Sequence, residues 1–207
     1  MLVKFPSLVM GLFPKWLWHK SRKERVLYLT FDDGPSPGIT EWVLETLARF
    51  DAKATFFCIG DKVRRHPETL RRVHGAGHSI GNHTFNHLNL WKTPVTAYLE
   101  NTEKCQAALE ELLGEGLRLF RPPYGRMTPR IARRLQASYD LVMWEVIAWD
   151  FSAHQSREQV ALNVIRNARE GSIVVFHDSE KAEAKMKYAL EKTLEHFARQ
   201  GYRFEGL

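Results

Sequence analysis

The chain has 207 residues, of which 44% are hydrophobic and 26% are charged, which is the composition of a folded globular domain rather than of a disordered or fibrous chain. Its net charge of +6 is concentrated at the start, because residues 1–25 hold six basic residues against Glu24 alone. The remainder is nearly neutral. This distribution argues against a nucleic-acid-binding protein, in which Lys and Arg would spread over a binding face.

Residues 1–25, called the arm below, are basic and aromatic. The arm contains no run of about 18 apolar residues, and Pro6 and Pro14 interrupt it, so no transmembrane span is expected. No small-residue cleavage site follows its short apolar run, so no clear signal peptide is predicted. Two interpretations remain open: its Trp and Phe side chains pack on the rest of the protein, or they contact a membrane surface together with Lys and Arg. The expected location is the cytoplasm or the membrane surface.

From residue 26 onward, predicted strands and helices alternate along the chain. The strands are expected at about 26–32, 54–59, 78–82, 117–120, 140–147, 172–177 and 202–205. The helices are expected at about 39–50, 61–75, 94–113, 128–137, 156–170 and 180–200. Thr128-Pro129 and Ser156 with Gln159 are typical helix starts, and Thr93-Pro94 predicts another. Strict alternation predicts a parallel sheet, and without an internal linker residues 26–207 are interpreted as one domain.

Short polar clusters follow five of these predicted strands. They are Asp32-Asp33, His83 with His87, Arg121 to Gly125, Asp150, and His177-Asp178. Because the carboxyl ends of parallel strands meet at one edge of the sheet, these clusters are expected to converge. An open sheet draws on a few loops at one switch point, whereas contributions from this many strands favour a closed or nearly closed barrel.

Two of the clusters have the residue types of a metal site. In Asp32-Asp33-Gly34-Pro35, one carboxylate can bind a metal while the other faces a substrate, although the same pattern also occurs as an ordinary acidic turn. His83 and His87, four residues apart, can grip one metal from a shared face, or can be incidental loop histidines. Three ligands from Asp33, His83 and His87 would leave a fourth position open, as in catalytic zinc sites.

Two further clusters suggest catalysis. The stiff loop Arg121-Pro122-Pro123-Tyr124-Gly125 could hold a carboxylate or offer a backbone N–H to an oxyanion, and otherwise it is a structural turn. His177, at the end of an apolar strand, is placed for acid–base work, or is a buried structural histidine. Asp150 alone is a weaker signal.

In this order the clusters resemble the motifs of the polysaccharide deacetylase family, also called the NodB homology domain or carbohydrate esterase family four. The resemblance covers about Val26 to Phe204. Thr30 to Pro35 is similar to the first motif, His83 to His87 to the second, Arg121 to Gly125 to the third, and Val175 to His177 to the fifth. It implies a distorted, incomplete (β/α) barrel of about seven parallel strands in an α/β fold.

The resemblance also implies an activity and roles. The expected enzyme is a metal-dependent hydrolase that removes N-acetyl groups from the amino sugars of a poly- or oligosaccharide, with an N-acetylated glycan as its partner. The divalent ion would be zinc in most members, or cobalt or another ion, held by Asp33, His83 and His87. The remaining roles implied are a general base (Asp32), a cation paired with that base (Arg121), a general acid (His177) and substrate or oxyanion contacts (Tyr124, Pro123, Asp150 and Phe151).

The fourth motif departs from the family pattern. Many members carry Asp-x-x-Asp-Trp, with the first Asp tuning the acid histidine, whereas this chain has Ile147 and Phe151 at the first and last positions. The resemblance therefore implies that His177 lacks an ion-pair partner, which would lower its pKa unless Glu145 or Asp178 substitutes. Phe151 could still wall an apolar pocket for the acetyl methyl group.

Two alternative functions remain open. A deacylase of a lipid-linked amino sugar would suit the aromatic, basic arm. A non-catalytic carbohydrate-binding relative is motivated by Ile147 and would bind sugar without releasing an acyl group.

Overall fold

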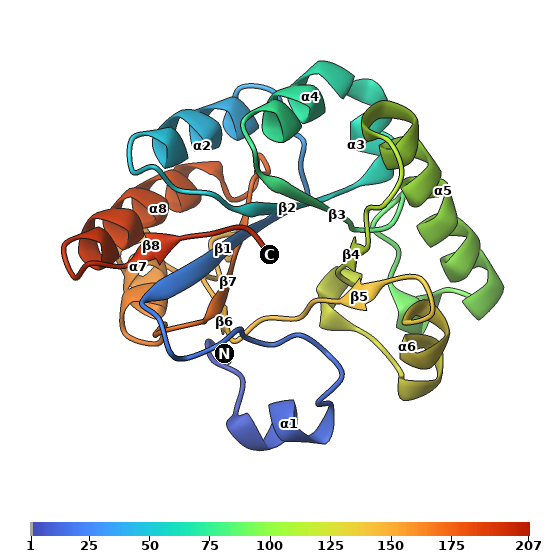
Figure 1. Cartoon of the computed structure of the whole chain (residues 1–207), viewed down its shortest axis with the longest axis horizontal. Helices are drawn as coiled ribbons and strands as arrows, with labels where there is room; N and C mark the ends of the chain where they lie inside the picture. Colours follow the sequence, from blue (N-terminus) through green and yellow to red (C-terminus); the bar gives the residue numbers. More distant parts are fainter. Residues whose placement is uncertain (1) are drawn as a thin grey trace.

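The computed structural model describes residues 2–207, and its centre is a curled parallel sheet with helices along the outside (Figure 1). The strand order is β5-β4-β3-β2-β1-β7-β6, and β8 pairs with the start of β1. Every strand pair is parallel. The strands are β1 (Val26–Asp32), β2 (Thr55–Cys58), β3 (Ser79–Asn82), β4 (Leu119–Phe120), β5 (Asp140–Leu141), β6 (Val146–Ile147), β7 (Ile173–His177) and β8 (Arg203–Phe204). The expected incomplete (β/α) barrel is confirmed.

Helices connect successive strands of this sheet, as the alternation predicted. They are α2 (Ile39–Ala48), α3 (Gly60–Arg65), α4 (Pro67–Gly75), α5 (Val95–Leu113), α6 (Pro129–Leu135), α7 (Arg157–Ile165) and α8 (Glu183–Ala198), with 3-10 turns η1 (Leu90–Lys92) and η2 (Pro123–Gly125). Thr128 and Ser156 cap α6 and α7 through their hydroxyl groups. The helix expected at 61–75 is split, because His66 takes φ −132° and ψ 55° before Pro67, a proline that disfavours helical geometry in the preceding residue.

The strand expected at 140–147 is also split, and the arm fills the interruption. Leu17 donates its N–H to the carbonyl of Leu141 at 2.8 Å and accepts from the N–H of Met143 at 2.8 Å. Nearer the N-terminus, the N–H of Phe5 donates to the carbonyl of Glu145 at 2.9 Å. The arm, with the short helix α1 (Ser7–Leu12), therefore packs on the body of the protein, which was one of its two interpretations.

Alternate residues of the sheet enter two different cores. One core lies between the sheet and the outer helices and includes Phe31 and Phe176. The other fills the inner side of the curl. Its buried residues include Phe57, Val142, Met143, Trp144, Ile147, Ile173 and Val175, together with Met10 and Trp18 from the arm. The arm thus completes the interior of the half-barrel.

A buried carboxylate fixes the arm to the sheet. Glu145 is fully buried, and its oxygens lie 3.4 Å from Lys4 Nζ, 2.8 Å from Arg22 Nη2 and 3.5 Å from Arg169 Nε, while Ser172 donates its hydroxyl at 2.7 Å. Two basic residues of the arm, Lys4 and Arg22, are consequently paired with a carboxylate of the protein body. Among residues 2–207, no helix is both long and apolar enough to cross a membrane.

Candidate active site

The register of the two central strands brings two candidate catalytic side chains together. Asp32 ends β1, His177 ends β7, and the two are direct partners in the parallel pairing. Both side chains face one pocket with a volume of about 610 Å³. Backbone strain is concentrated around it, because the pocket residues Asp33, His87 and Tyr124 have φ values of 79°, 54° and 61°. Positive φ is costly for such residues and is often retained at functional sites.

Asp33, His83 and His87 converge as the spacing predicted, with ligand-type atoms within 4.8 Å of one another. Asp33 Oδ1 lies 3.3 Å from His87 Nε2 and 3.8 Å from His83 Nε2. The same oxygen is buried and has no hydrogen-bond partner in the described chain. His83 Nδ1 is 2.7 Å from the carbonyl of Arg121, which orients the ring and leaves Nε2 toward Asp33.

The protonation states of these histidines suit a metal. Burial, reinforced by the neighbouring His87, lowers the pKa of His83 to about 3. Burial also lowers the pKa of His87. Both imidazoles are therefore neutral at pH 7 and can donate lone pairs, and the unpartnered oxygen of Asp33 supplies an anionic ligand. This donor set fits a divalent ion.

Asp32 is held by a buried guanidinium. Arg121 is fully buried, and its Nη1 donates to Asp32 Oδ1 and to Thr30 Oγ1, both at 2.7 Å. Its Nη2 donates to the carbonyl of Met143 at 3.0 Å, and the guanidinium lies 4.1 Å from the centre of the Phe57 ring. The bond from Arg121 occupies one oxygen of Asp32 and leaves Oδ2 for the pocket.

The expectation that His177 lacks an ion-pair partner is wrong. Asp150 is buried, its Oδ1 lies 2.8 Å from His177 Nδ1, and its Oδ2 accepts from the backbone N–H of His177 at 2.8 Å. Burial would lower the pKa of His177, but Asp150, with Asp33 and Asp32, raises it to about 9. The suggested substitutes are engaged elsewhere, since Glu145 binds the arm and Asp178 accepts from Thr40 Oγ1 at 2.6 Å.

Two residues expected at the substrate lie behind the pocket surface. Asp150 is buried beneath His177 and is not among the lining residues. Pro123 is also buried, whereas its neighbours Pro122 and Tyr124 line the pocket. Phe151 does line it, with its ring edge-on to His177 at 4.8 Å between centres.

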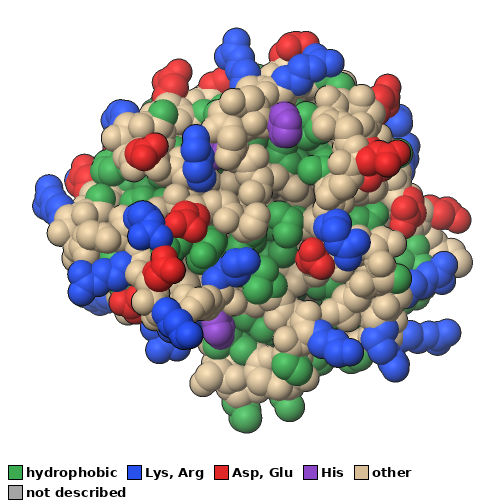
Figure 2. All heavy atoms as spheres, viewed as in Figure 1, with side chains coloured by type: hydrophobic (Ala, Val, Ile, Leu, Met, Phe, Trp, Pro, Cys, Tyr) green, Lys and Arg blue, Asp and Glu red, His purple; other side chains and the backbone are tan. Residues whose placement is uncertain are grey.

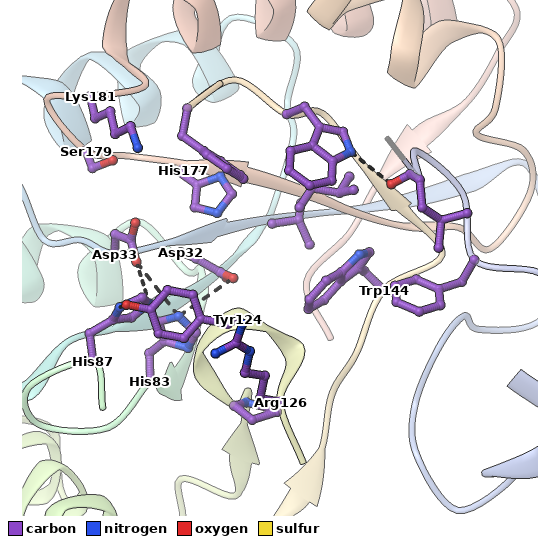
Figure 3. Close-up of a pocket in the computed structure, with 17 residues that line it drawn as sticks. Asp32, Asp33, His83, His87, Tyr124, Arg126, Trp144, His177, Ser179 and Lys181 are labelled. Atoms are coloured by element: carbon purple, nitrogen blue, oxygen red, sulfur yellow. Dashed lines mark hydrogen bonds and ion pairs between the residues drawn. The ribbon is translucent and has the colours of Figure 1, made fainter. Parts of the chain in front are cut away.

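The pocket has a polar end and an apolar end (Figure 3). Asp33, His83 and His87 lie together at the polar end, with His177 facing Asp32, and Trp144 lies to the other side. The pocket residues that the sequence did not single out are Leu2, Phe5, Arg126, Trp144, Trp149, Ser179 and Lys181. The apolar members carry no motif signal, because aromatic and aliphatic residues in an arm or strand are interpreted first as core.

Comparison with known proteins gives consistent relatives. A peptidoglycan-N-acetylglucosamine deacetylase of Bacillus cereus is 35% identical over 192 residues, which are 90% of this chain and 88% of the relative. A chitooligosaccharide deacetylase of Azorhizobium caulinodans is 36% identical over 160 residues, which are 76% of each protein. The peptidoglycan-N-acetylmuramic acid deacetylase PdaC of Bacillus subtilis is 31% identical over 86% of this chain, which spans 37% of that longer protein.

A solved structure agrees with the sequence relatives. The Bc1960 peptidoglycan N-acetylglucosamine deacetylase, in complex with 4-naphthalen-1-yl-N-oxidanyl-benzamide, superposes with a TM-score of 0.89 at 28% identity and covers 98% of this chain and 95% of its own. The family model described as polysaccharide deacetylase matches residues 19–144, more than half of the chain. The chain therefore belongs to the polysaccharide deacetylase family.

Proposed function

We propose that the chain is a zinc-dependent deacetylase of a peptidoglycan-type glycan, with Asp32 as general base and His177 as general acid. Family membership gives the reaction class, which is hydrolysis of the N-acetyl amide bond of an amino sugar. The observation that carries the assignment of roles is the pairing of Asp32 with His177 across β1 and β7, each held by its own buried partner.

Asp33, His83 and His87 would hold the divalent ion, which would supply Lewis acidity toward the amide carbonyl. Asp32 Oδ2 takes the proton of the attacking water, while Arg121 fixes the other oxygen. His177 gives its proton from Nε2 to the leaving amine, because Nδ1 is engaged by Asp150. The water oxygen bonds to the carbonyl carbon, the C–N bond breaks, and acetate and the free amino sugar leave.

Two cations at the pocket favour an anionic glycan over a neutral one. Arg126 and Lys181 both line the pocket, and Figure 3 shows them on different sides of the Asp32–His177 pair. Peptidoglycan carries lactyl and peptide carboxylates near its amino sugars, whereas chitin-like chains carry none. Charge complementarity therefore supports a peptidoglycan-type substrate.

The test measures acetate released by zinc-loaded protein from peptidoglycan fragments and from acetylated chito-oligosaccharides, beside the Asp32→Asn variant. We expect release by the wild type and a loss of at least about 100-fold in the variant. Zinc content and the circular dichroism spectrum of Asp32→Asn serve as controls for metal binding and folding. Absence of release from the peptidoglycan fragments by folded, zinc-bound wild type would overturn the proposal, whatever the result with chito-oligosaccharides.

The structure gives no support to the alternative of a non-catalytic carbohydrate-binding protein. That interpretation depended on a missing partner for His177, and Asp150 occupies that place. Base, acid and metal ligands all face one pocket, which supports turnover rather than binding alone.

The proposal includes contact of α1 with a membrane surface. Leu8 and Leu12 are 78% and 67% exposed, and Figure 2 shows hydrophobic side chains protruding at the lower edge, over α1. Arg133 on α6 and Lys15 of the arm, both exposed, line one groove together with Leu12. An apolar ridge flanked by cations is complementary to anionic lipid headgroups.

Replacing Leu8 and Leu12 by Ser tests this contact without disturbing the pocket. We expect weaker co-sedimentation with anionic vesicles and unchanged deacetylation of a soluble substrate, with Val95→Ser, an exposed residue on α5, as the control. Equal vesicle binding by the wild type and the double variant would reject the contact. Deletion of the whole arm is unsuitable, because it would uncover the inner core.

A further inference from the structure

Beside the catalytic residues, the pocket continues into an apolar recess. We use this name for the part of the pocket lined by Leu2, Phe5, Trp144, Ile147, Trp149 and Val175. All six side chains line the same cavity of about 610 Å³ as Asp32 and His177. In Figure 3, Trp144 lies on the opposite side of Asp32 from Asp33 and His87. The recess therefore opens from the catalytic centre, away from the metal ligands.

The strand register places the recess directly beneath the catalytic residues. Val175 lies two residues before His177 on β7 and pairs with Thr30 on one side and Ile147 on the other. Residues two apart on a strand point to the same face, so Val175 and His177 share the inner face of the sheet. A group bound between Asp32 and His177 thus meets the apolar side chains of Val175 and Ile147 in the next layer.

The arm forms the far wall of the recess. The carbonyl of Leu2 accepts from Trp149 Nε1 at 2.9 Å, and the N–H of Ile147 donates to the carbonyl of Val3 at 2.9 Å. Phe5 packs edge-on against Trp144, with 5.7 Å between ring centres. The arm backbone is therefore fixed by two hydrogen bonds at the recess, and the side chains of Leu2 and Phe5 set its depth.

We propose that the apolar recess receives N-acyl groups longer than acetyl, so that the protein also hydrolyses N-propionyl and N-butyryl amino sugars. This inference rests on the proposed function. The single methyl of an acetyl group held between Asp32 and His177 would meet Val175 and Ile147 first, whereas Leu2 and Phe5 form the far wall. A longer chain would cover these side chains, and each methylene buried there raises affinity about three- to fourfold.

The reaction is the same hydrolysis with a different acid released. Water adds to the acyl carbon, the C–N bond breaks, and propanoate or butanoate leaves in place of acetate. Asp32 and His177 keep their roles, since only the alkyl end of the acyl group changes position. Acyl length is limited where the chain reaches the arm.

The experiment compares chitotetraose carrying N-acetyl, N-propionyl, N-butyryl or N-hexanoyl groups as substrates of the zinc-loaded protein. We expect kcat/KM for propionyl and butyryl within about tenfold of that for acetyl. Phe5→Ala deepens the recess and should raise the hexanoyl-to-acetyl ratio at least about fivefold. Ile147→Asp places a charge in its floor and should lower the butyryl-to-acetyl ratio at least about tenfold. Leu8→Ala, an exposed arm residue outside the pocket, should change neither ratio.

Binding provides a second readout that does not depend on turnover. Trp144 and Trp149 line the recess, so their fluorescence in the Asp32→Asn variant should respond to the acyl group, and affinity should rise from acetyl to butyryl. If Phe5→Ala fails to fold, Leu2→Ala, at a residue 51% exposed, enlarges the same wall.

The outcomes separate the two proposals. One outcome would overturn the recess proposal and leave deacetylation intact. In that outcome the protein releases acetate, hydrolyses the propionyl and butyryl substrates more than about 100-fold more slowly, and binds the substrates with an affinity that does not rise with acyl length. Absence of release from these chitotetraoses and also from peptidoglycan fragments would overturn the proposed function, whereas rising affinity in Asp32→Asn would still support the recess.

Discussion

Both carboxylate oxygens of Asp150 hydrogen-bond to His177, with Oδ1 2.8 Å from the ring Nδ1 and Oδ2 2.8 Å from the backbone nitrogen. Because of this contact, His177 and His83 have different protonation states at pH 7. The pKa of His177 is raised to about 9, while burial lowers that of His83 to about 3. At pH 7 one imidazole carries a proton to donate and the other is free to bind a metal. Groups whose environments push their pKa values apart in this way are typical of acid–base sites.

The variant Asp150→Asn should remove the acid without removing the histidine. Burial lowers the pKa of His177 and Asp150 is the main group opposing that effect, so the pKa should fall from about 9 toward or below the ordinary 6.5. A general acid works only below its pKa. The basic limb of the pH profile should therefore move to lower pH. If the pKa falls to 6.5, the protonated fraction at pH 8, and kcat/KM with it, should fall about 30-fold.

NMR titration of His177 and the pH profile of acetate release check this prediction together. Asp178→Asn is the matched control, because Asp178 is an equally buried carboxyl next to His177 in sequence that hydrogen-bonds Thr40 instead. A basic limb that stays in place in Asp150→Asn would show that Asp150 does not tune the acid.

His83→Ala and His87→Ala should each abolish tight zinc binding. Each variant removes one of three converging ligands and leaves the Asp33 carboxylate with a single imidazole. Zinc per chain after dialysis, measured by elemental analysis, should fall from near one to near zero. His74→Ala, at an exposed position near the end of α4, should keep its zinc. Full zinc stoichiometry in both ligand variants would contradict the assignment of the site.

The sequence predicted the sheet and the convergence of the polar clusters because both follow local rules. Buried strands such as β7 are marked by continuous apolar residues, and the polar residues that follow them must meet at one edge. The sequence alone therefore predicts that one edge of the sheet holds Asp32, Asp33, His83, His87 and His177.

The role of Asp150 could not be predicted in the same way. Position in a motif does not say which carboxylate points at His177, since that depends on the turn in which Trp149 takes φ 63°. The position of the arm against the sheet could not be predicted from the sequence either. Its pairing with residues 141–147 joins segments more than 120 residues apart, and its aromatic side chains are compatible with either a core or a lipid surface.

Arg126 and Lys181 should discriminate between charged and neutral glycans. Replacing either by Ala removes a cation from the pocket lining but leaves the metal ligands, Asp32 and His177 unchanged. We expect KM for peptidoglycan fragments to rise about five- to tenfold, kcat to change little, and chito-oligosaccharide kinetics to change less than twofold. The effect should shrink at high salt. Equal changes for both glycans would indicate a role in shaping the pocket rather than in charge recognition.

Arg121 should be the most costly residue of the site to replace. It is fully buried and donates to Asp32, Thr30 and the carbonyl of Met143, so Arg121→Met leaves a carboxylate that is 4% exposed without its cation. Breaking a buried ion pair from one side costs about 3–5 kcal/mol of unfolding free energy, measured by urea denaturation.

A double-mutant cycle separates the charge from the packing of Arg121. Adding Asp32→Asn to Arg121→Met removes the uncompensated carboxylate and should recover more than half of the lost stability. Arg118→Met, which breaks an exposed pair with Asp140 at 3.6 Å, should cost less than about 1 kcal/mol. If Arg121→Met cost no more than Arg118→Met, Arg121 would not be holding a charged Asp32.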